Sequence, residues 1–261
     1  MRSISSGVSL VALALILLGT AHPATALQPP NVFRGALLLE GQIQAGDYDM
    51  VRRFLGHKEY FDKISEGVFL ASPGGNVLEA IKIGYLLRSL ELRTLLPTGN
   101  PGGRATYSVI GPQDLKNPKD YMCASACFFL YIAGIDRDSS HIDRLGIHRP
   151  TLKAQVWATN SEKGRAAAAL RLRRIITYYV QRMGVSEKLI DLMYSVPANR
   201  VHWVTKEEYS ALIKGQTAEL KAALEQNCAP MIKSPVSTAL CRRRTEIELA
   251  ADAWQKTYRS Q

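Results

Sequence analysis

Short apolar runs alternate along this chain with longer segments whose apolar residues recur at helical spacing. Apolar runs of about four to eight residues between turn residues are typical of buried strands, and an apolar residue every three to four positions is typical of helices. The first hundred residues follow this order twice. The expected elements are a strand at 35–44, a helix through residue 54, a strand at 67–71, a turn at 72–75, a helix at 77–90 capped by Asn76, and a strand at 92–97.

A glycine- and proline-rich segment interrupts the pattern at 98–120, where four glycines and three prolines indicate a loop or lid. Beyond it, the alanine-, arginine- and leucine-rich stretch at 161–183 has the strongest helical pattern. Strands that alternate with helices predict an α/β domain with parallel strand pairing. The expected elements are a helix at 123–132, a strand at 145–148 that Pro150 ends, helices at 161–183 and 186–194, a strand at 203–205, and helices at 206–212, 218–226 and 242–258.

The first 26 residues have the layout of a secretory signal peptide. A positive charge at Arg2 precedes an apolar run at 8–18, and small residues end the segment at Ala26. The run is too short to span a bilayer, which takes about 20 apolar residues. We therefore expect cleavage after Ala26, transport across the inner membrane into the periplasm, and a mature chain with a core domain at 27–215 and a helical, cysteine-bearing extension at 216–261.

The four cysteines of this exported chain are expected to form disulfides, because an oxidising compartment favours pairing. Four cysteines allow three connectivities. We favour Cys228 with Cys241, which closes a loop in the extension, and Cys123 with Cys127, which stand one helical turn apart. The thiols do not form two Cys-x-x-Cys pairs and no histidine cluster accompanies them, so the sequence predicts no metal site.

The net charge of +10 does not by itself indicate a nucleic-acid partner, because the basic residues are scattered along the chain. In an exported protein such charge ordinarily forms a solvated surface, which is able to touch anionic polymers of the cell envelope. We expect no nucleic acid among the partners.

Three short motifs carry candidate chemistry. The Ser-Pro-Gly-Gly turn at 72–75 leaves backbone N–H groups uncovered, and such groups are able to hold a developing oxyanion. Ser125 lies between two alanines at the expected start of a helix, where a serine is accessible and negative charge is favoured. His148 ends a strand beside a proline, so that its ring would project from the sheet edge into a cleft. Each motif alone also fits a structural role: a tight turn, a helix cap and a packed histidine.

Together, the order and spacing of these motifs resemble the ClpP/crotonase superfamily, and with the signal peptide and cysteines they look like the exported Clp-protease-like proteins of bacteria. The resemblance runs from about residue 35 to residue 212. It implies an α/β fold, a spiral of β-β-α units with a helical C-terminal appendage. It also implies a nucleophile at Ser125, a general base at His148, and oxyanion N–H groups from Gly74, Gly75 and Ala126.

The third catalytic residue departs from the family, which places an aspartate shortly before its last strand. Here the matching stretch, 197–202, contains no carboxylate. Asn199 is the nearest polar candidate, because an amide is able to orient an imidazole, whereas Asp191 lies one helix earlier and suits the position less well. A serine–lysine pair with Lys82 or Lys153 is an alternative that fits the motifs less closely.

The resemblance therefore implies an exported serine hydrolase, a peptidase that uses no metal and no cofactor. Its substrates would be peptides or unfolded proteins, and the chain is expected to form a homo-oligomer. An ATP-driven unfoldase partner is not expected, because the space beyond the inner membrane lacks ATP. The alternative is a catalytically silent binding or assembly module of the same fold, since fold alone does not establish activity. A crotonase acting on acyl-CoA thioesters is disfavoured by export.

Overall fold

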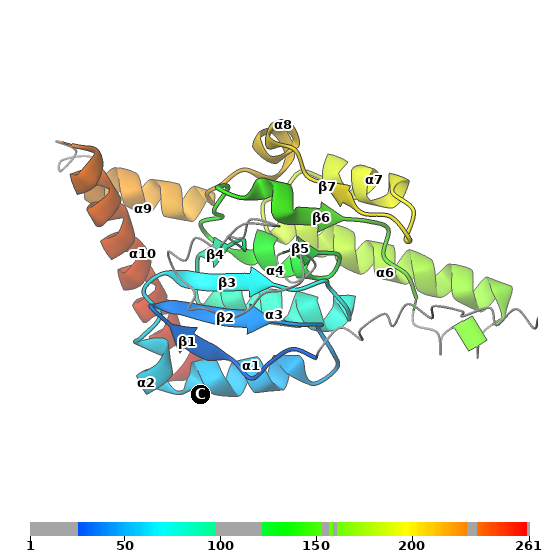
Figure 1. Ribbon diagram of the computed structural model, residues 1–261, viewed down its shortest axis with the longest axis horizontal. Coiled ribbons are helices and arrows are strands. Elements are labelled where there is room, and N and C mark those ends of the chain that lie inside the picture. The colour runs from blue at the N-terminus through cyan, green and yellow to red at the C-terminus, as the bar shows by residue number, and fades with distance from the viewer. Residues whose placement is uncertain (1–25, 98–121, 153–156, 159–160, 229–233, 260–261) are drawn as a thin grey trace, which may run out of the picture.

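The computed structural model describes residues 26–97, 122–152, 157–158, 161–228 and 234–259 (Figure 1). The expected signal peptide up to Thr25, the expected loop at 98–120 and Lys153 lie outside these residues. The described chain has a mixed α/β structure in which helices pack around two small sheets. Among its helices, none combines the length and the apolar character that crossing a bilayer requires.

The first sheet has four strands in the order β1-β2-β3-β4. Strands β2, β3 and β4 pair in parallel, as the sequence predicts, and β1 is antiparallel to β2. All five residues of β3 and the first four of β2 are buried, which is why these strands are continuous apolar runs rather than alternating ones. The strands are β1 (Asn31–Phe33), β2 (Ala36–Glu40), β3 (Gly67–Ala71) and β4 (Thr94–Leu95).

The second sheet contains β5 (Cys123–Ala124), β6 (Leu145–Ile147) and β7 (His202–Trp203). Strands β5 and β6 are parallel, and β7 is antiparallel to β6. Ser72, directly after β3, joins the two sheets, because its N–H donates to the Met122 carbonyl at 2.8 Å and its carbonyl accepts from the Ala124 N–H at 3.0 Å. The carboxyl ends of β3, β5 and β6 therefore lie side by side.

The helices cover the sheets and supply most of the core. Helix α4 is buried along its whole length and packs against α3, which runs behind the first sheet in Figure 1. In chain order the helices before the C-terminal segment are α1 (Asp47–Gly56), α2 (Lys58–Phe61), α3 (Val77–Ser89), α4 (Cys127–Ala133), α6 (Glu162–Arg182), α7 (Lys188–Ser195) and α8 (Lys206–Glu208), which continues as a π-helical turn at Tyr209–Ile213.

Two adjacent tyrosines on α6 have opposite roles. The side chain of Tyr179 is buried between α3 and α4, where its hydroxyl donates to the Phe129 carbonyl at 2.6 Å and its ring meets the ring of Tyr85 edge-on at 5.0 Å. Burial raises the pKa of Tyr179 well above its usual value. The side chain of Tyr178 is 61% exposed. Tyr179 therefore packs in the core, whereas Tyr178 is free to meet another surface.

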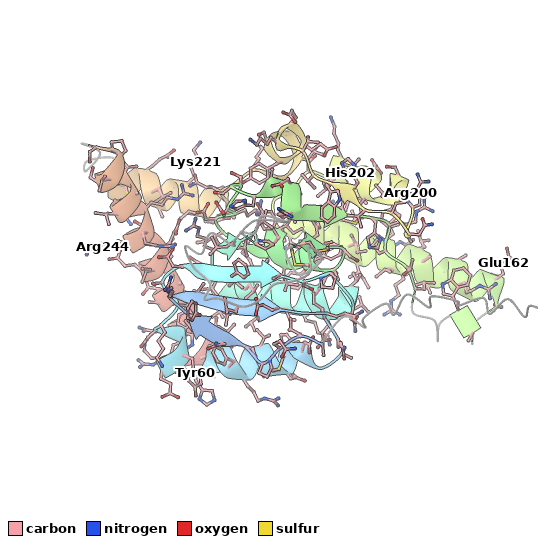
Figure 2. All side chains as sticks on the ribbon, in the orientation of Figure 1. Tyr60, Glu162, Arg200, His202, Lys221 and Arg244 are labelled. Carbon is pink, nitrogen blue, oxygen red and sulfur yellow. A yellow bond between two sulfur atoms is a disulfide. The ribbon has the colours of Figure 1, made fainter. Side chains whose placement is uncertain are left out.

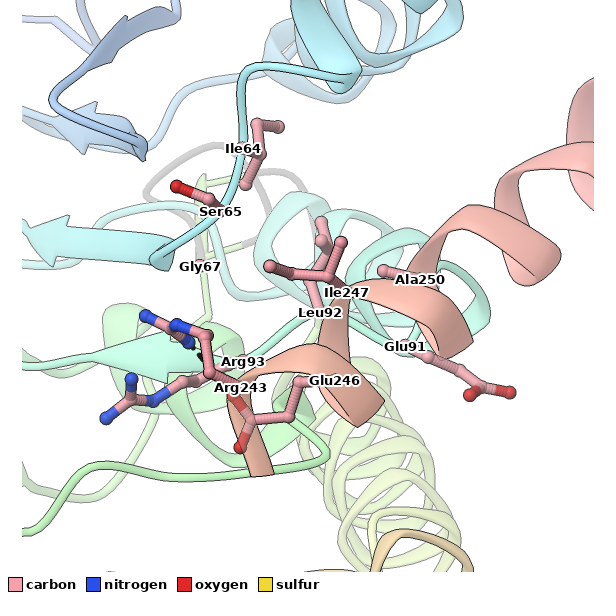
Figure 3. A pocket seen from close by; sticks show the side chains of 10 residues that line it. All are labelled: Ile64, Ser65, Gly67, Glu91, Leu92, Arg93, Arg243, Glu246, Ile247 and Ala250. Carbon is pink, nitrogen blue, oxygen red and sulfur yellow. Dashed lines mark hydrogen bonds and ion pairs between the residues drawn. The ribbon is translucent and has the colours of Figure 1, made fainter. Parts of the chain in front are cut away.

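The C-terminal segment consists of α9 (Ala218–Cys228) and α10 (Pro235–Tyr258), which the Cys228–Cys241 disulfide joins. Helix α10, red in Figure 1, passes the amino ends of the parallel strands β2 and β3. Its Trp254 is buried in the main core, and the indole N–H donates to the Leu55 carbonyl at 2.7 Å. A shallow pocket remains between α10 and the amino end of β3 (Figure 3). The C-terminal helices therefore pack against the rest of the described chain.

Several boundaries differ from those expected from the sequence. The helix expected at 123–132 begins only at Cys127, because Cys123 and Ala124 form β5. The helix expected at 242–258 begins already at Pro235, where Ser234 and Ser237 form a capping box and proline suits the first helical turn. Two short elements, β1 and α2, were not expected, since three or four residues leave little periodicity to detect.

Candidate active site

Ser125 occupies a sharp turn between β5 and α4. Its φ angle is +58°, in the left-handed region that residues with a side chain seldom adopt. The Ser125 N–H is held by the Gly146 carbonyl of the neighbouring strand at 2.9 Å. A serine on a strained strand-to-helix turn is the geometry by which several hydrolases expose a nucleophile. The Ser125 hydroxyl has no hydrogen-bond partner among the described residues and is half-buried.

The Cys123–Cys127 disulfide spans this turn. Its Cα atoms are 5.1 Å apart, and both cysteines are completely buried. The expected pairing is therefore confirmed, as is that of Cys228 with Cys241. The expected geometry is wrong, however, because the bond joins a strand residue to the first residue of a helix and does not lie within one helical turn. Ser125 is thus enclosed in a small covalent loop.

Gly74 lies directly against Ser125. A Cβ atom on Gly74 would stand 2.5 Å from the Cβ of Ser125 and 2.9 Å from the backbone nitrogen of Ala126, which is closer than side chains tolerate. Its φ angle of +105° also favours glycine. The missing side chain thus lets the backbone of the 72–75 turn approach the Ser125 turn closely. The sequence motifs at 72–75 and 123–127, separated by about fifty residues, are brought together here.

The two glycines of the turn differ in their N–H groups. The Gly74 N–H donates to the Ser72 hydroxyl at 3.1 Å, so it is engaged within the turn. Gly75 is exposed, and neither its N–H nor that of Ala126 has an acceptor in the part of the chain that the structure describes. Of the three N–H groups expected to hold an oxyanion, these two are therefore unbonded within the described residues, but Ala126 is completely buried and only Gly75 is exposed.

His148 follows the last residue of β6, next to the turn that carries Ser125. Strands β5 and β6 pair in parallel, with Ala124 opposite Gly146, so Ser125 and His148 leave the sheet at the same edge. The imidazole Nδ1 lies 3.0 Å from the carbonyl oxygen of Arg149. The residue is half-buried. No hydrogen bond joins His148 to the Ser125 hydroxyl within the described residues, a separation that is common in sites without substrate.

The other candidate site residues form no hydrogen bond with His148 within the described residues. Asn199 is exposed in the turn between α7 and β7, and no hydrogen bond connects it with His148 among the described residues. Asp191 forms an exposed ion pair with Arg173 at 3.1 Å. The Lys82 ammonium pairs with the buried Glu79 carboxylate at 3.2 Å, which leaves it poorly placed as a base for Ser125.

The partner of the His148 Nδ1 atom is a group that the sequence reasoning missed. A backbone carbonyl is not visible in the pattern of side chains. The Arg149-Pro150 pair nevertheless indicates a fixed carbonyl, because proline restricts the backbone conformation of the residue before it. No group of three or more metal-binding side chains gathers within the described residues. His202 bonds the Glu208 carboxylate at 2.8 Å beside α8.

Comparison with known proteins finds likenesses among solved structures. The chain is similar to a mutant ClpP1 from Listeria monocytogenes, with a TM-score of 0.40 and 16% sequence identity over 68% of this chain and 86% of that one. No family model matches the sequence, and no curated protein matches it. What the site is able to do therefore follows from its own residues.

Proposed function

We propose that this protein is an exported serine hydrolase, a peptidase that uses Ser125 as nucleophile and His148 as general base. The observation that carries the proposal is the contact of the Gly74–Gly75 turn with the strained Ser125 turn. It brings an unbonded hydroxyl close to two backbone N–H groups that have no acceptor among the described residues. This combination supports acyl transfer, because oxyanion donors act when they are positioned before the charge develops.

The proposed reaction follows the serine-hydrolase pattern. The Ser125 Oγ attacks the substrate carbonyl carbon while the His148 Nε2 accepts the hydroxyl proton, and the N–H groups of Gly75 and Ala126 hold the oxyanion. His148 then returns the proton to the leaving amine, which leaves an acyl group on Ser125. A water molecule, deprotonated by His148, releases the acyl group and restores the hydroxyl. One oxyanion donor alone contributes about 10²- to 10³-fold in rate in comparable enzymes.

Location and substrate are part of the same proposal. Two disulfides fit an oxidising environment, and the residues up to Ala26 have the layout of a signal peptide, so we place the mature chain in the periplasm. There, substrates would reach the site as peptides or unfolded proteins, without an ATP-driven unfoldase. The fold that the motifs imply is the ClpP/crotonase spiral of β-β-α units.

Association with further copies is also proposed. Helix α3 exposes Leu78 and Tyr85, which are 46% and 38% exposed, and α6 exposes Tyr178. Exposed large apolar side chains on neighbouring helices are typical of protein interfaces. A homo-oligomer would cover them, and light scattering of the purified chain would reveal it as a molar mass above that of the monomer.

Covalent labelling with a fluorophosphonate probe, read by intact mass, tests the proposed chemistry. The mature protein should gain one probe adduct. Ser125→Ala should lose labelling completely, and His148→Ala should slow it by about 10²- to 10⁴-fold, the usual worth of a positioned base. Ser140→Ala, at an exposed serine bonded to Asp138, is the matched control and should label as the unchanged protein does.

The opposite outcome favours the alternative function. If the folded protein is not labelled, or if Ser125→Ala is labelled equally, Ser125 is not activated. The chain would then be a catalytically silent binding or assembly module of the cell envelope.

A further inference from the structure

The geometry points to the backbone carbonyl of Arg149 as the group that orients His148, in the place where a side-chain carboxylate is expected. This inference rests on the proposed function, since it concerns the base of the same site. Arg149 is thus a positioning residue, which acts on the reaction only through His148. Its carbonyl oxygen lies 3.0 Å from the His148 Nδ1 atom.

The contact selects one form of the imidazole ring. A carbonyl oxygen has lone pairs and no proton, so it only accepts hydrogen bonds. The Nδ1 atom of His148 must therefore carry the proton in the neutral ring, and the Nε2 atom keeps its lone pair. A general base needs this tautomer, because its free lone pair receives the serine proton. The remaining acceptor nitrogen is the one that the proposed mechanism uses.

Two features fix the direction of this carbonyl. Pro150 follows Arg149, and a proline confines the preceding residue to the extended region, which limits the rotation that would turn the carbonyl away. The Arg149 N–H also donates to the Val196 carbonyl at 3.0 Å, and its side-chain Nε donates to the Tyr194 carbonyl at 2.9 Å. Arg149 is therefore attached by backbone and side chain to the end of α7, where helix carbonyls lack partners within the helix.

Helix α7 is itself a firm support. Its residues Leu189, Ile190 and Met193 are buried in the main core. On its outer face, the guanidinium of Arg173 from α6 lies over the ring of Tyr194 at 4.7 Å and pairs with Asp191 at 3.1 Å. Because α7 is packed in the core and Arg149 is hydrogen-bonded to the end of α7, the core fixes the position of the Arg149 carbonyl.

A neutral carbonyl differs chemically from a carboxylate. It holds the ring and its tautomer, but it carries no full charge to stabilise the imidazolium that forms during the reaction. The Arg149 carbonyl therefore orients the ring without supplying the charge that a carboxylate would. It also assigns no orienting role to Asn199, which is exposed and does not bond the ring.

Long-range proton–nitrogen NMR spectra of the mature protein with ¹⁵N-labelled histidine test the inference. These spectra distinguish the two neutral tautomers, and the His148 signals are identified by their loss in His148→Gln. The unchanged protein should show the Nδ1-protonated form. Arg149→Ala combined with Pro150→Ala should release the carbonyl, increase the Nε2-protonated form, and slow fluorophosphonate labelling by about tenfold or more, since misplaced groups cost up to about 100-fold.

Arg200→Ala is the matched control, because Arg200 is an exposed arginine near the same edge (Figure 2) and its side chain should leave the tautomer and labelling unchanged. A His148 that is mainly Nε2-protonated in the unchanged protein overturns the inference. So does a tautomer shift in Asn199→Ala without one in the Arg149 and Pro150 variant. Because NMR reads the ring directly, labelling with the other tautomer refutes only the inference, whereas the expected tautomer without any labelling refutes only the proposed function.

Discussion

The two ends of the first sheet differ in whether their polar groups have partners. At the carboxyl end, the Ser125 hydroxyl and the N–H groups of Gly75 and Ala126 lack partners among the described residues. At the amino end, beside the pocket of Figure 3, the buried carboxylates of Asp136 and Glu246 pair with partly exposed arginine side chains. This network, which we call the amino-end ion cluster, consists of Arg93, Asp136, Arg242, Arg243 and Glu246.

This difference in hydrogen bonding distinguishes a candidate binding site at the carboxyl end from a structural ion network at the amino end. The Asp136 carboxylate is 3% exposed and pairs with Arg93 at 3.3 Å and with Arg242 at 2.5 Å. Buried charges that are satisfied by each other offer nothing to a ligand, and here they attach α10 to the sheet. Unbonded donors around an accessible hydroxyl are the groups able to receive a substrate. Changes at the amino end should therefore alter stability, and changes at the carboxyl end should alter reactivity.

The largest effect on stability is expected from Asp136→Ala. It removes the buried partner of Arg93 and one of the two buried carboxylates that pair with Arg242, and breaking a buried pair costs about 3–5 kcal/mol. Chemical denaturation should report a loss in this range. Asp62→Ala is the matched control, because Asp62 belongs to an exposed pair with Lys58 that is worth at most about 1 kcal/mol. If Asp136→Ala slowed labelling of Ser125 in the folded protein, the two ends would not be independent.

The two disulfides give the sharpest matched comparison. The chain-entropy relation predicts a loss of about 3 kcal/mol when Cys228 and Cys241, 13 residues apart, become alanines, and about 2 kcal/mol for Cys123 and Cys127, four apart. Only the second pair encloses Ser125. Labelling of Ser125 should therefore slow by about tenfold or more in the Cys123/Cys127 variant, although it is the less destabilised one. Labelling should stay unchanged in the Cys228/Cys241 variant. Equal labelling of both variants would deny the disulfide any role in holding the serine.

A smaller effect is expected from Glu79→Gln. Burial alone would raise the pKa of Glu79, but the Tyr48 N–H, the Lys82 ammonium and the Gly46 N–H outweigh it and hold this pKa below the ordinary 4.5. A lowered pKa stabilises the fold above about pH 4.5, and the contribution disappears as the pH falls through the folded value.

Denaturation curves at several pH values measure this difference. Glu79→Gln should cost about 1 kcal/mol at pH 7, and the gap to the unchanged protein should close in acid. Glu59→Gln, at an exposed helix position, should show no such gap. If the stability difference between Glu79→Gln and the unchanged protein widened in acid, the pKa of Glu79 would not be lowered in the folded state.

The apolar strands and the glycine turn were predictable because their signals are local, whereas the short strands β1 and β5 were not expected. The run at 67–71 matches β3, and Asn76 caps α3 as expected. The left-handed angle of Ser125 was not predictable, since it depends on its contacts with Gly74 and Gly146. The Arg149 carbonyl was missed for a similar reason. Backbone groups have no letter in the sequence, and their directions follow from tertiary packing.

Because the Cys123–Cys127 bond is buried, the time at which it forms relative to folding matters. Because neither cysteine is exposed to solvent, a reductant is unable to reach the bond unless the core opens. The oxidation state of the serine turn is thus decided once, while the chain folds, and is afterwards retained. Copies that fold before they meet an oxidant would keep their thiols, so the order of oxidation and folding determines which copies carry a closed serine turn.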